Sequence, residues 1–173
     1  MNDEQRVKDS RDQLNVVMSF FGRVDSKLST VTAINTAMLA ALSASFPPLG
    51  SMKWWMWISP AATAFMLALG YVQLYRGSFP TLVGGHSSLI YFREIARRTE
   101  ANFVAEYRAA QDANSLASDV LGQVWRNSEI LVLKYNALKC AFTLMALAVM
   151  PWVISLATFA IVKSNLRLLV ISH

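Results

Sequence analysis

The sequence of 173 residues contains one cysteine and two histidines, which excludes several kinds of site. Cys140 alone cannot form an internal disulfide or a cluster of thiolate metal ligands. His86 and His173 do not have the spacing of a zinc-binding helix. The sequence also lacks a nucleophile elbow, a phosphate loop and clustered carboxylates facing a base. These absences predict a protein that is not an enzyme and holds no metal or other cofactor.

Charged residues are scarce, at 16% of the chain against about 25% in soluble domains. None occurs in residues 28–52, 54–75 or 140–162. A helix that crosses a hydrocarbon core of about 30 Å needs roughly 20 residues, and each stretch is long enough. The sequence therefore predicts an all-α integral membrane protein with three transmembrane helices, at 29–46, 54–75 and 140–162.

Two polar segments flank these predicted spans. Residues 1–28 carry apolar side chains at helical spacing, which predicts an amphipathic cytoplasmic helix that continues into the first span without a break. Residues 77–139 are expected to form a cytoplasmic helical hairpin, the sensor segment, between the second and third spans. Residues 163–173 follow as a tail, in which only residues 166–171 show any alternation typical of a strand.

Within the sensor segment, glycine and proline indicate a loop over residues 77–86. Ser87 is a plausible N-cap for a helix that reaches about Ala110. A turn at 112–115 then leads into a last helix, which begins near Leu116 and runs into the third span.

The distribution of basic residues predicts the orientation. With the N-terminus inside, thirteen Lys and Arg face the cytoplasm, while Lys53, Lys163 and Arg167 lie outside. The positive-inside rule favours this arrangement. Pro151 should kink the third span. A re-entrant pair of half-helices at Pro151 is the alternative, and it would return the tail to the cytoplasm.

Asp25 and Lys27 lie where the first helix is expected to enter the membrane. A charge at that position needs a partner, although an interfacial anchor or an intrahelical pair is an equally simple explanation. Deeper in the span, Asn35 is the strongest hydrogen-bonding side chain near the membrane interior. In the same span, Ala33, Ala37, Ala41 and Ser45 recur every four residues. Small residues at this spacing allow two helices to approach closely in lipid, and they predict a homo-oligomer.

Arginines gather on the first helix of the sensor segment. Arg93 and Arg97 are four residues apart and share a helix face, while Glu94 can pair with Arg98. Two guanidinium groups on one face can bind a phosphate bidentately. A solvated face, or contact with anionic lipid headgroups, explains the same pattern.

The last helix carries a polar face of Gln123, Asn127 and Lys134, with Arg126 beside it. Amides can recognise the edge of a base and a lysine can bind a phosphate. Polar contacts between packed helices explain this face equally well. The six candidate ligand-binding residues are thus Arg93, Arg97, Gln123, Arg126, Asn127 and Lys134.

Three segments resemble the sequence blocks of the Pycsar effector family of bacterial membrane proteins. They are VDSKLSTVTAIN at 24–35, SSLIYFREIA at 87–96 and LGQVWRNSEILVLKY at 121–135. Their order and their spacing relative to the predicted spans are similar to the family's pattern. The positions that carry the resemblance are Asp25, Lys27, Asn35, Phe92, Ile95, Ala96, Gln123, Lys134 and Tyr135.

The resemblance implies an anti-phage effector in the bacterial inner membrane. Such an effector senses a cyclic pyrimidine mononucleotide, cyclic UMP or cyclic CMP, which a partner cyclase makes on infection, and it disrupts the membrane so that growth stops. The cyclic nucleotide would be an activating ligand rather than a cofactor. We expect Asp25, Lys27, Asn35, Tyr135 and Pro151 to have structural or gating roles.

The polar segment is too short for the β-roll that usually binds cyclic nucleotides. A nucleotide site would therefore be a helical cleft completed by another subunit, and no binding of nucleic acid is expected. The alternatives are an accessory membrane subunit whose basic helices dock a partner protein, and a small channel. The spans argue against transport because they contain no ionisable residue.

Overall fold

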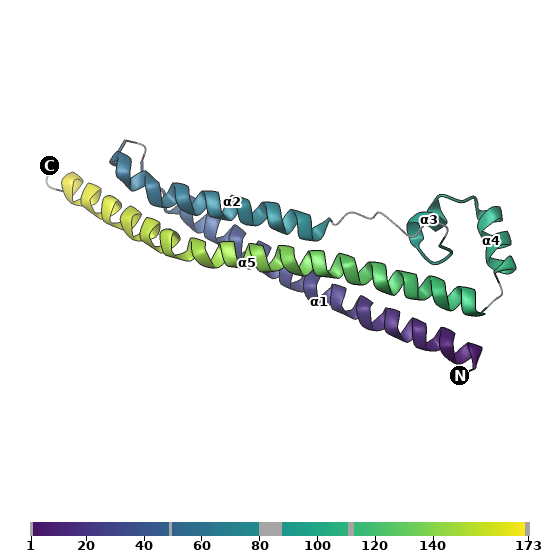
Figure 1. The fold of residues 1–173 in the computed structure, drawn as a ribbon. Coiled ribbons are helices and arrows are strands. Elements are labelled where there is room, and N and C mark those ends of the chain that lie inside the picture. Colours follow the sequence, from purple (N-terminus) through teal and green to yellow (C-terminus); the bar gives the residue numbers. More distant parts are fainter. Residues whose placement is uncertain (1, 49, 80–87, 111–112, 172–173) are drawn as a thin grey trace. The chain divides into compact units, whose positions relative to one another are not determined.

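The computed structural model describes residues 2–48, 50–79, 88–110 and 113–171 (Figure 1). Every regular element in these residues is a helix, and no strand occurs among them, so the predicted all-helical class is confirmed for this part of the chain. The elements are α1 (Asp3–Ala44), η1 (Trp54–Trp57), α2 (Ile58–Ser78), α3 (Phe92–Ala96), α4 (Glu100–Ala109) and α5 (Ala113–Ile171).

The contacts between residues divide the chain into two compact units. The polar unit comprises residues 1–25 and 80–134, and the apolar unit comprises residues 26–79 and 135–173. Helices α1 and α5 each contribute to both units because each is one uninterrupted helix. The prediction that residues 1–28 and the first span form a single helix is thus confirmed.

In the apolar unit, α1 buries one side of its surface. Its buried side chains alternate in steps of three and four residues, which is the spacing of helices packed along a shared seam. They are Leu28, Val31, Asn35, Met38 and Leu42. The small-residue ridge lies elsewhere: Ala33 and Ala37 are exposed in the unit. That ridge therefore remains free to contact a second copy.

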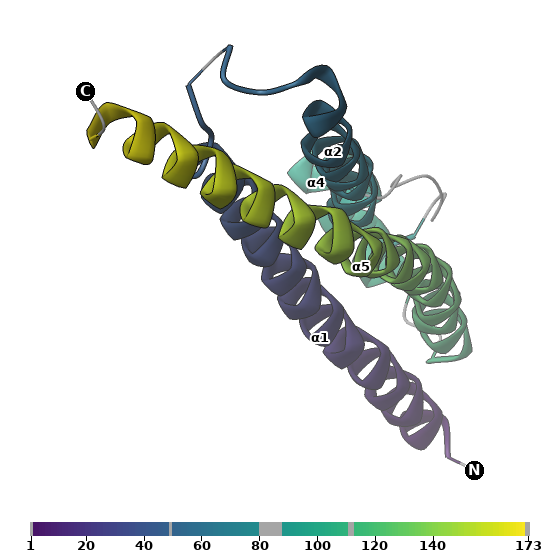
Figure 2. The same cartoon turned by 90° about the vertical axis from the view of Figure 1, so that its left-hand side faces the viewer.

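Helix α2 packs antiparallel to both long helices of the apolar unit (Figures 1 and 2). Tyr71 shares a hydrogen bond of 2.7 Å with Thr36 on α1, and Ser59 donates one of 2.6 Å to the Pro151 carbonyl on α5. Glycine permits the closest contacts. A Cβ at Gly77 would lie 3.1 Å from the Cβ of Ala137 and 3.2 Å from Leu28. Gly77 of α2 and Ala137 of α5 therefore allow these two helices to approach closely.

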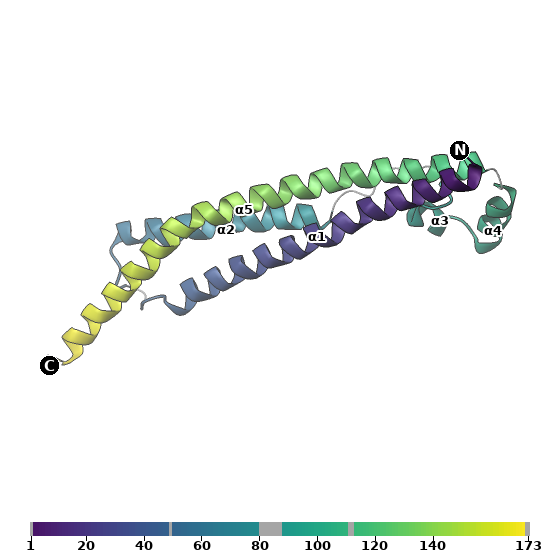
Figure 3. The same cartoon turned by 90° about the horizontal axis from the view of Figure 1, so that it is seen from below.

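Helix α5 runs through Pro151 without interruption, which contradicts the re-entrant alternative. Figure 3 shows that the axis of α5 turns in the yellow-green part of the helix, as expected of a helix that contains a proline. Two side chains support the region: the Ser155 hydroxyl donates to the Pro151 carbonyl, and the Trp152 indole donates to the Met38 carbonyl at 2.9 Å. Residues 166–171 continue this helix, so a strand in the tail is wrong.

Two stretches of helix in the described residues are long and apolar enough to cross a membrane, Trp54–Ser78 and Asn114–Asn165. Large apolar side chains cover their outer surfaces: Phe65 is 65% exposed and Ile154 is 52% exposed. In water such a surface would be costly, whereas lipid removes the cost. The predicted first span is the second half of α1, which is not one of these two stretches.

In the polar unit, the predicted single helix up to Ala110 is wrong. It is two helices, α3 and α4, because Thr99 has an extended backbone and its hydroxyl accepts the N–H of Asn102, which starts α4. The Arg98 guanidinium stabilises the break by donating to the Ser88 carbonyl at 3.0 Å and by pairing with Glu106 at 2.8 Å. Charge-assisted bonds of this kind are stronger than neutral ones.

Other boundaries also differ from the predictions. Helix α2 extends to Ser78, so the loop expected over 77–86 begins later. Residues 80–86 of that loop, and the predicted N-cap Ser87, lie outside the described residues. Ser88 instead accepts the N–H groups of Ile90 and Tyr91. Helix α5 begins at Ala113, inside the expected turn.

The tight contact at Gly77 gives a first prediction. Gly77→Val should lower the free energy of unfolding by about 1–3 kcal/mol, because the added atoms must displace Ala137 and Leu28. Denaturant titration in detergent, followed by circular dichroism, measures this. Gly22→Val is the matched control on α1, where an added Cβ meets nothing within 4 Å. Equal losses in both variants would contradict close packing at Gly77.

Candidate functional site

The polar unit contains a cavity of about 850 Å³ between three helices. One wall is a face of α1, with Lys8, Arg11 and Asn15 on it, and the opposite wall includes Tyr107 and Arg108 of α4. The beginning of α5 completes the cavity. The full lining is Glu4, Val7, Lys8, Arg11, Asp12, Asn15, Leu89, Tyr107, Arg108, Ala110, Ser115, Leu116 and Asp119.

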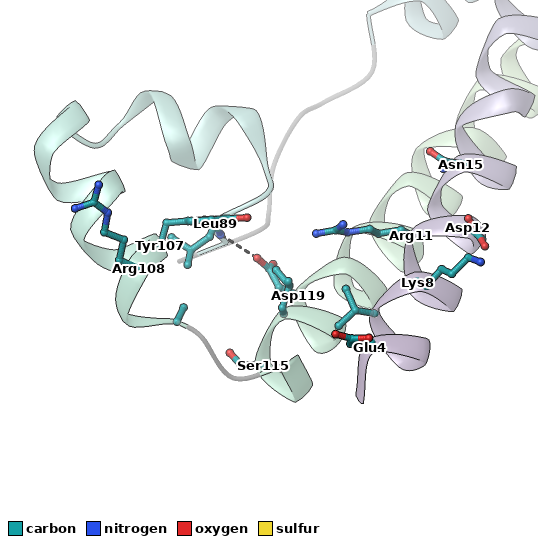
Figure 4. A pocket seen from close by; sticks show the side chains of 13 residues that line it. Glu4, Lys8, Arg11, Asp12, Asn15, Leu89, Tyr107, Arg108, Ser115 and Asp119 are labelled. Carbon is teal, nitrogen blue, oxygen red and sulfur yellow. Dashed lines mark hydrogen bonds between the residues drawn. The ribbon is translucent and has the colours of Figure 1, made fainter. Parts of the chain in front are cut away.

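Charged residues of both signs line this cavity. Figure 4 shows the Arg11 guanidinium reaching from α1 toward the side where Tyr107 and Asp119 lie. Among the described residues, Lys8, Arg11 and Arg108 form no ion pair or hydrogen bond through their side chains. Three carboxylates, of Glu4, Asp12 and Asp119, balance the three cations. The cavity thus suits a ligand with an anionic group and several hydrogen-bond donors.

Hydrogen bonds fix the back of the cavity. The Leu89 N–H donates to the Asp119 carboxylate at 2.9 Å (Figure 4). The adjacent Ser88 hydroxyl is buried and accepts from the Gln123 amide at 3.2 Å. The segment after the undescribed residues 80–87 is therefore attached to α5 through two side chains, which holds the cavity wall in place.

The predicted arginine pair lies on and beside α3. Arg93 is exposed and has an interaction within the chain. Arg97 is the C-cap residue, 58% exposed at its side chain, and pairs with Glu94 at 2.5 Å. The expected side-chain pairing of Glu94 with Arg98 is wrong, because Arg98 binds the Glu94 carbonyl and the Glu106 carboxylate instead.

The predicted polar face of α5 is largely engaged within the protein. Gln123 is buried and bonded to Ser88. Arg126 pairs with Glu129 at 2.9 Å, and Asn127 is half-buried. None of the six candidate ligand-binding residues lines the 850 Å³ cavity.

Lys134, the last of the six, is buried against α1. Its side chain is 8% exposed, and its ammonium group donates to the Asp25 carboxylate at 2.5 Å. The same ammonium lies 5.6 Å from the centre of the Phe21 ring, a cation–π distance. The prediction that Asp25 needs a partner is therefore met by Lys134.

The other candidate gating residues lie in the apolar unit. Lys27 and Tyr135 line a groove of about 410 Å³ between α1 and α5. Asn35 is fully buried, and neither atom of its amide has a hydrogen-bond partner among the described residues. Pro151 supplies the carbonyl that accepts from both Ser59 and Ser155.

Sequence reasoning missed the cavity and its basic residues. One wall of the cavity could have been found in the sequence of α1, because Glu4, Lys8, Arg11 and Asn15 recur at helical spacing and form a polar stripe. The sequence does not reveal that α4 and the start of α5 close over this stripe. Tyr107 and Arg108, which also line the cavity, lie almost a hundred residues after Arg11 in the sequence.

The described residues form helices without strands, include two helices of membrane-crossing length and contain a small charged unit, which indicates a membrane protein. The model of the Pycsar effector protein domain matches residues 9–161. The chain therefore belongs to the Pycsar effector family, as the three sequence blocks predicted, and is a membrane effector of an anti-phage system. Neither a curated protein nor a solved structure matches it significantly.

Proposed function

We propose that this protein is activated by a cyclic pyrimidine mononucleotide and then disrupts the bacterial inner membrane, which arrests growth during phage infection. A partner cyclase would supply the nucleotide. The observation that carries the proposal is the family match over residues 9–161 in a chain that combines apolar helices with a ligand-sized charged cavity. In this proposal the protein is not an enzyme.

The cavity supports a nucleotide ligand through its chemistry. A cyclic mononucleotide has about 20 non-hydrogen atoms, and pockets of roughly 300–1,000 Å³ hold ligands of that class. The cyclic phosphate carries one negative charge, which Arg11 or Lys8 can bind. Tyr107 offers a ring for stacking on the base. The carboxylates and Asn15 provide acceptors for the N–H and hydroxyl donors of the base and ribose.

Two locations compete for the nucleotide. The first is the predicted face formed by Arg93, Arg97, Gln123, Arg126, Asn127 and Lys134. Binding there would require breaking the bonds of Gln123 to Ser88 and of Lys134 to Asp25. A buried charge that loses its partner is strongly destabilising. The cavity imposes no such cost, since the three cations lining it have no ion-pair partner among the described residues, and we favour it.

The remaining features of the proposal concern the membrane. The second half of α1 would be a third span, with the N-terminus and the polar unit in the cytoplasm, as the basic residues predict. The exposed ridge of Ala33 and Ala37 would join copies into an oligomer. Because α1 and α5 are continuous helices, a ligand-dependent change in the polar unit can be transmitted to the spans, to the extent that the ligand prefers one state.

The binding test uses the purified full-length protein in detergent. Isothermal titration with cyclic UMP, cyclic CMP and cyclic AMP should show binding of a pyrimidine nucleotide in preference to cyclic AMP. Arg11→Ala should weaken that binding about tenfold or more, because a charge-assisted hydrogen bond contributes about 1.5–3 kcal/mol and 1.4 kcal/mol is one decade. Membrane-potential dyes in infected cells should then report less depolarisation.

Arg97→Ala is the matched variant because Arg97 is also an exposed arginine of the polar unit but lies outside the cavity. It should bind like the parent protein. Weaker nucleotide binding in Arg97→Ala, together with unchanged binding in Arg11→Ala, would indicate that the nucleotide binds at the predicted face and not in the cavity. If no cyclic nucleotide binds the parent protein, the sensing proposal is wrong.

A further inference from the structure

The apolar unit contains a groove between α1 and α5, of about 410 Å³, which the proposed sensing of nucleotides does not use. On α1 it is lined by Lys27, Thr30, Val31 and Ile34, which are spaced along one helix face. The polar members come first and the apolar members follow. The groove wall therefore changes from charged to apolar in the direction in which α1 runs.

Helix α5 forms the other wall of the groove. Its lining residues are Tyr135, Leu138, Lys139 and Phe142. In the apolar unit the two helices run parallel, since Trp152 of α5 binds the carbonyl of Met38 of α1, further along both helices. Leu28 and Ala137 both lie against Gly77, so Lys139 is about one helical turn further along the groove than Lys27. Ile34 and Phe142 follow further along the same two helices.

The two lysines have no partner within the part of the chain that the structure describes. Both are exposed, and neither ammonium group forms a hydrogen bond or an ion pair there. The Tyr135 hydroxyl also forms no hydrogen bond among the described residues. Three hydrogen-bond donors without a partner among the described residues therefore line a groove that also has apolar side chains in its wall.

A second copy of the apolar unit cannot neutralise these lysines. Residues 26–79 and 135–173 contain no Asp and no Glu. Burying two ammonium groups against another such surface would leave both charges uncompensated. The complementary partner must be an anion with an apolar body.

We propose that this groove binds an anionic phospholipid. The phosphate would lie between Lys27 and Lys139 and accept from the Tyr135 hydroxyl, and an acyl chain would follow Ile34, Leu138 and Phe142. This arrangement combines hydrophobic burial with charge pairing, because a basic residue near an anionic lipid surface contributes about fivefold in affinity (about 1 kcal/mol). The inference depends on the protein's residence in a membrane and not on nucleotide sensing.

The experiment uses the full-length protein, stripped of lipid in detergent and titrated with short-chain phosphatidylglycerol or phosphatidylcholine, with bound lipid counted by native mass spectrometry. Phosphatidylglycerol should bind at least tenfold more tightly than phosphatidylcholine. Glycerol phosphate, the headgroup without chains, should not bind. Binding of glycerol phosphate as tight as that of the lipid would overturn the lipid assignment in favour of a simple phosphate site.

The double variant Lys27→Gln/Lys139→Gln should lose about 25-fold of the preference for phosphatidylglycerol, at about fivefold for each lysine. Lys53→Gln/Lys163→Gln removes the same charge from lysines outside the groove and should keep the preference. Ile34→Trp narrows the groove and leaves both lysines in place, so it should weaken the binding of both lipids. Circular dichroism and gel filtration check folding for each variant. An unchanged preference in Lys27→Gln/Lys139→Gln, or an equal loss in the control pair, would overturn the proposal.

Discussion

Asp25→Ala should lower the free energy of unfolding by about 1–3 kcal/mol, because it leaves the buried ammonium group of Lys134 without its carboxylate partner. Lys134 is the buried partner, at 8% exposure, whereas the Asp25 side chain is 52% exposed. Asp25→Ala and Lys134→Met should therefore lower the free energy of unfolding by different amounts. Lys134→Met leaves a carboxylate that water reaches and a thioether that packs against Phe21, so its cost should be below about 1 kcal/mol.

A double-mutant cycle in detergent, with unfolding followed by circular dichroism, tests this asymmetry. Asp25→Ala/Lys134→Met should recover most of the stability that Asp25→Ala loses. The exposed pair of Arg126 and Glu129 is the matched control, and Glu129→Ala should cost less than about 1 kcal/mol. If Asp25→Ala and Lys134→Met lower the free energy of unfolding equally, the burial of Lys134 does not determine how much stability each variant loses.

The Asp25–Lys134 pair also shows where sequence reasoning stops. A charge at the expected membrane entry predicts a partner, since an unpaired charge there is costly. Its identity follows from the parallel packing of α1 and α5 in the polar unit, in which Arg6 binds Asn114 and Asp25 binds Lys134. The two pairs are separated by 108 and 109 residues. No local pattern encodes that register.

The long helices were predictable for the opposite reason. Apolar periodicity and the absence of breakers act locally, so α1 and the continuity of α5 follow from the sequence itself. Pro151 lies inside α5, and the hydroxyl groups of Ser59 and Ser155 both donate to its carbonyl. The separation of α3 from α4 was missed because it depends on Arg98 reaching Ser88 and Glu106. Distant contacts override helical spacing there.

The second large expected effect concerns the buried amide of Asn35 in the apolar unit. Its side chain is fully buried, and neither its oxygen nor its nitrogen has a hydrogen-bond partner among the described residues. Gly70 of α2 makes room for it, since a Cβ there would lie 3.1 Å from the Asn35 amide nitrogen. An unpaired buried amide costs about 1–3 kcal/mol. This state of the protein therefore contains a local source of instability.

Asn35→Val should raise the free energy of unfolding by about 1–2 kcal/mol, because it removes both unpaired atoms and places nothing as far toward Gly70. Thr63→Val is the matched control on α2. Thr63 is equally buried, but its hydroxyl donates to the Ser59 carbonyl at 3.0 Å, so its replacement should leave stability unchanged or lower it. A higher free energy of unfolding in Asn35→Val and no increase in Thr63→Val, measured by denaturant titration in detergent, are the expected result.

The same substitution should reduce activation. An amide that lacks a hydrogen-bond partner in one conformation favours any other conformation in which it finds one. A ligand can shift the equilibrium between two conformations only by its difference in affinity for them. Stabilising the present state by about 1.4 kcal/mol lowers the population of the alternative about tenfold. If a nucleotide activates the protein as proposed, Asn35→Val should therefore lower its apparent affinity and reduce the depolarisation at subsaturating ligand, each by up to about tenfold. If it is more stable and still depolarises fully, the instability at Asn35 has no part in activation; if it is less stable, the amide has a partner that this state does not reveal.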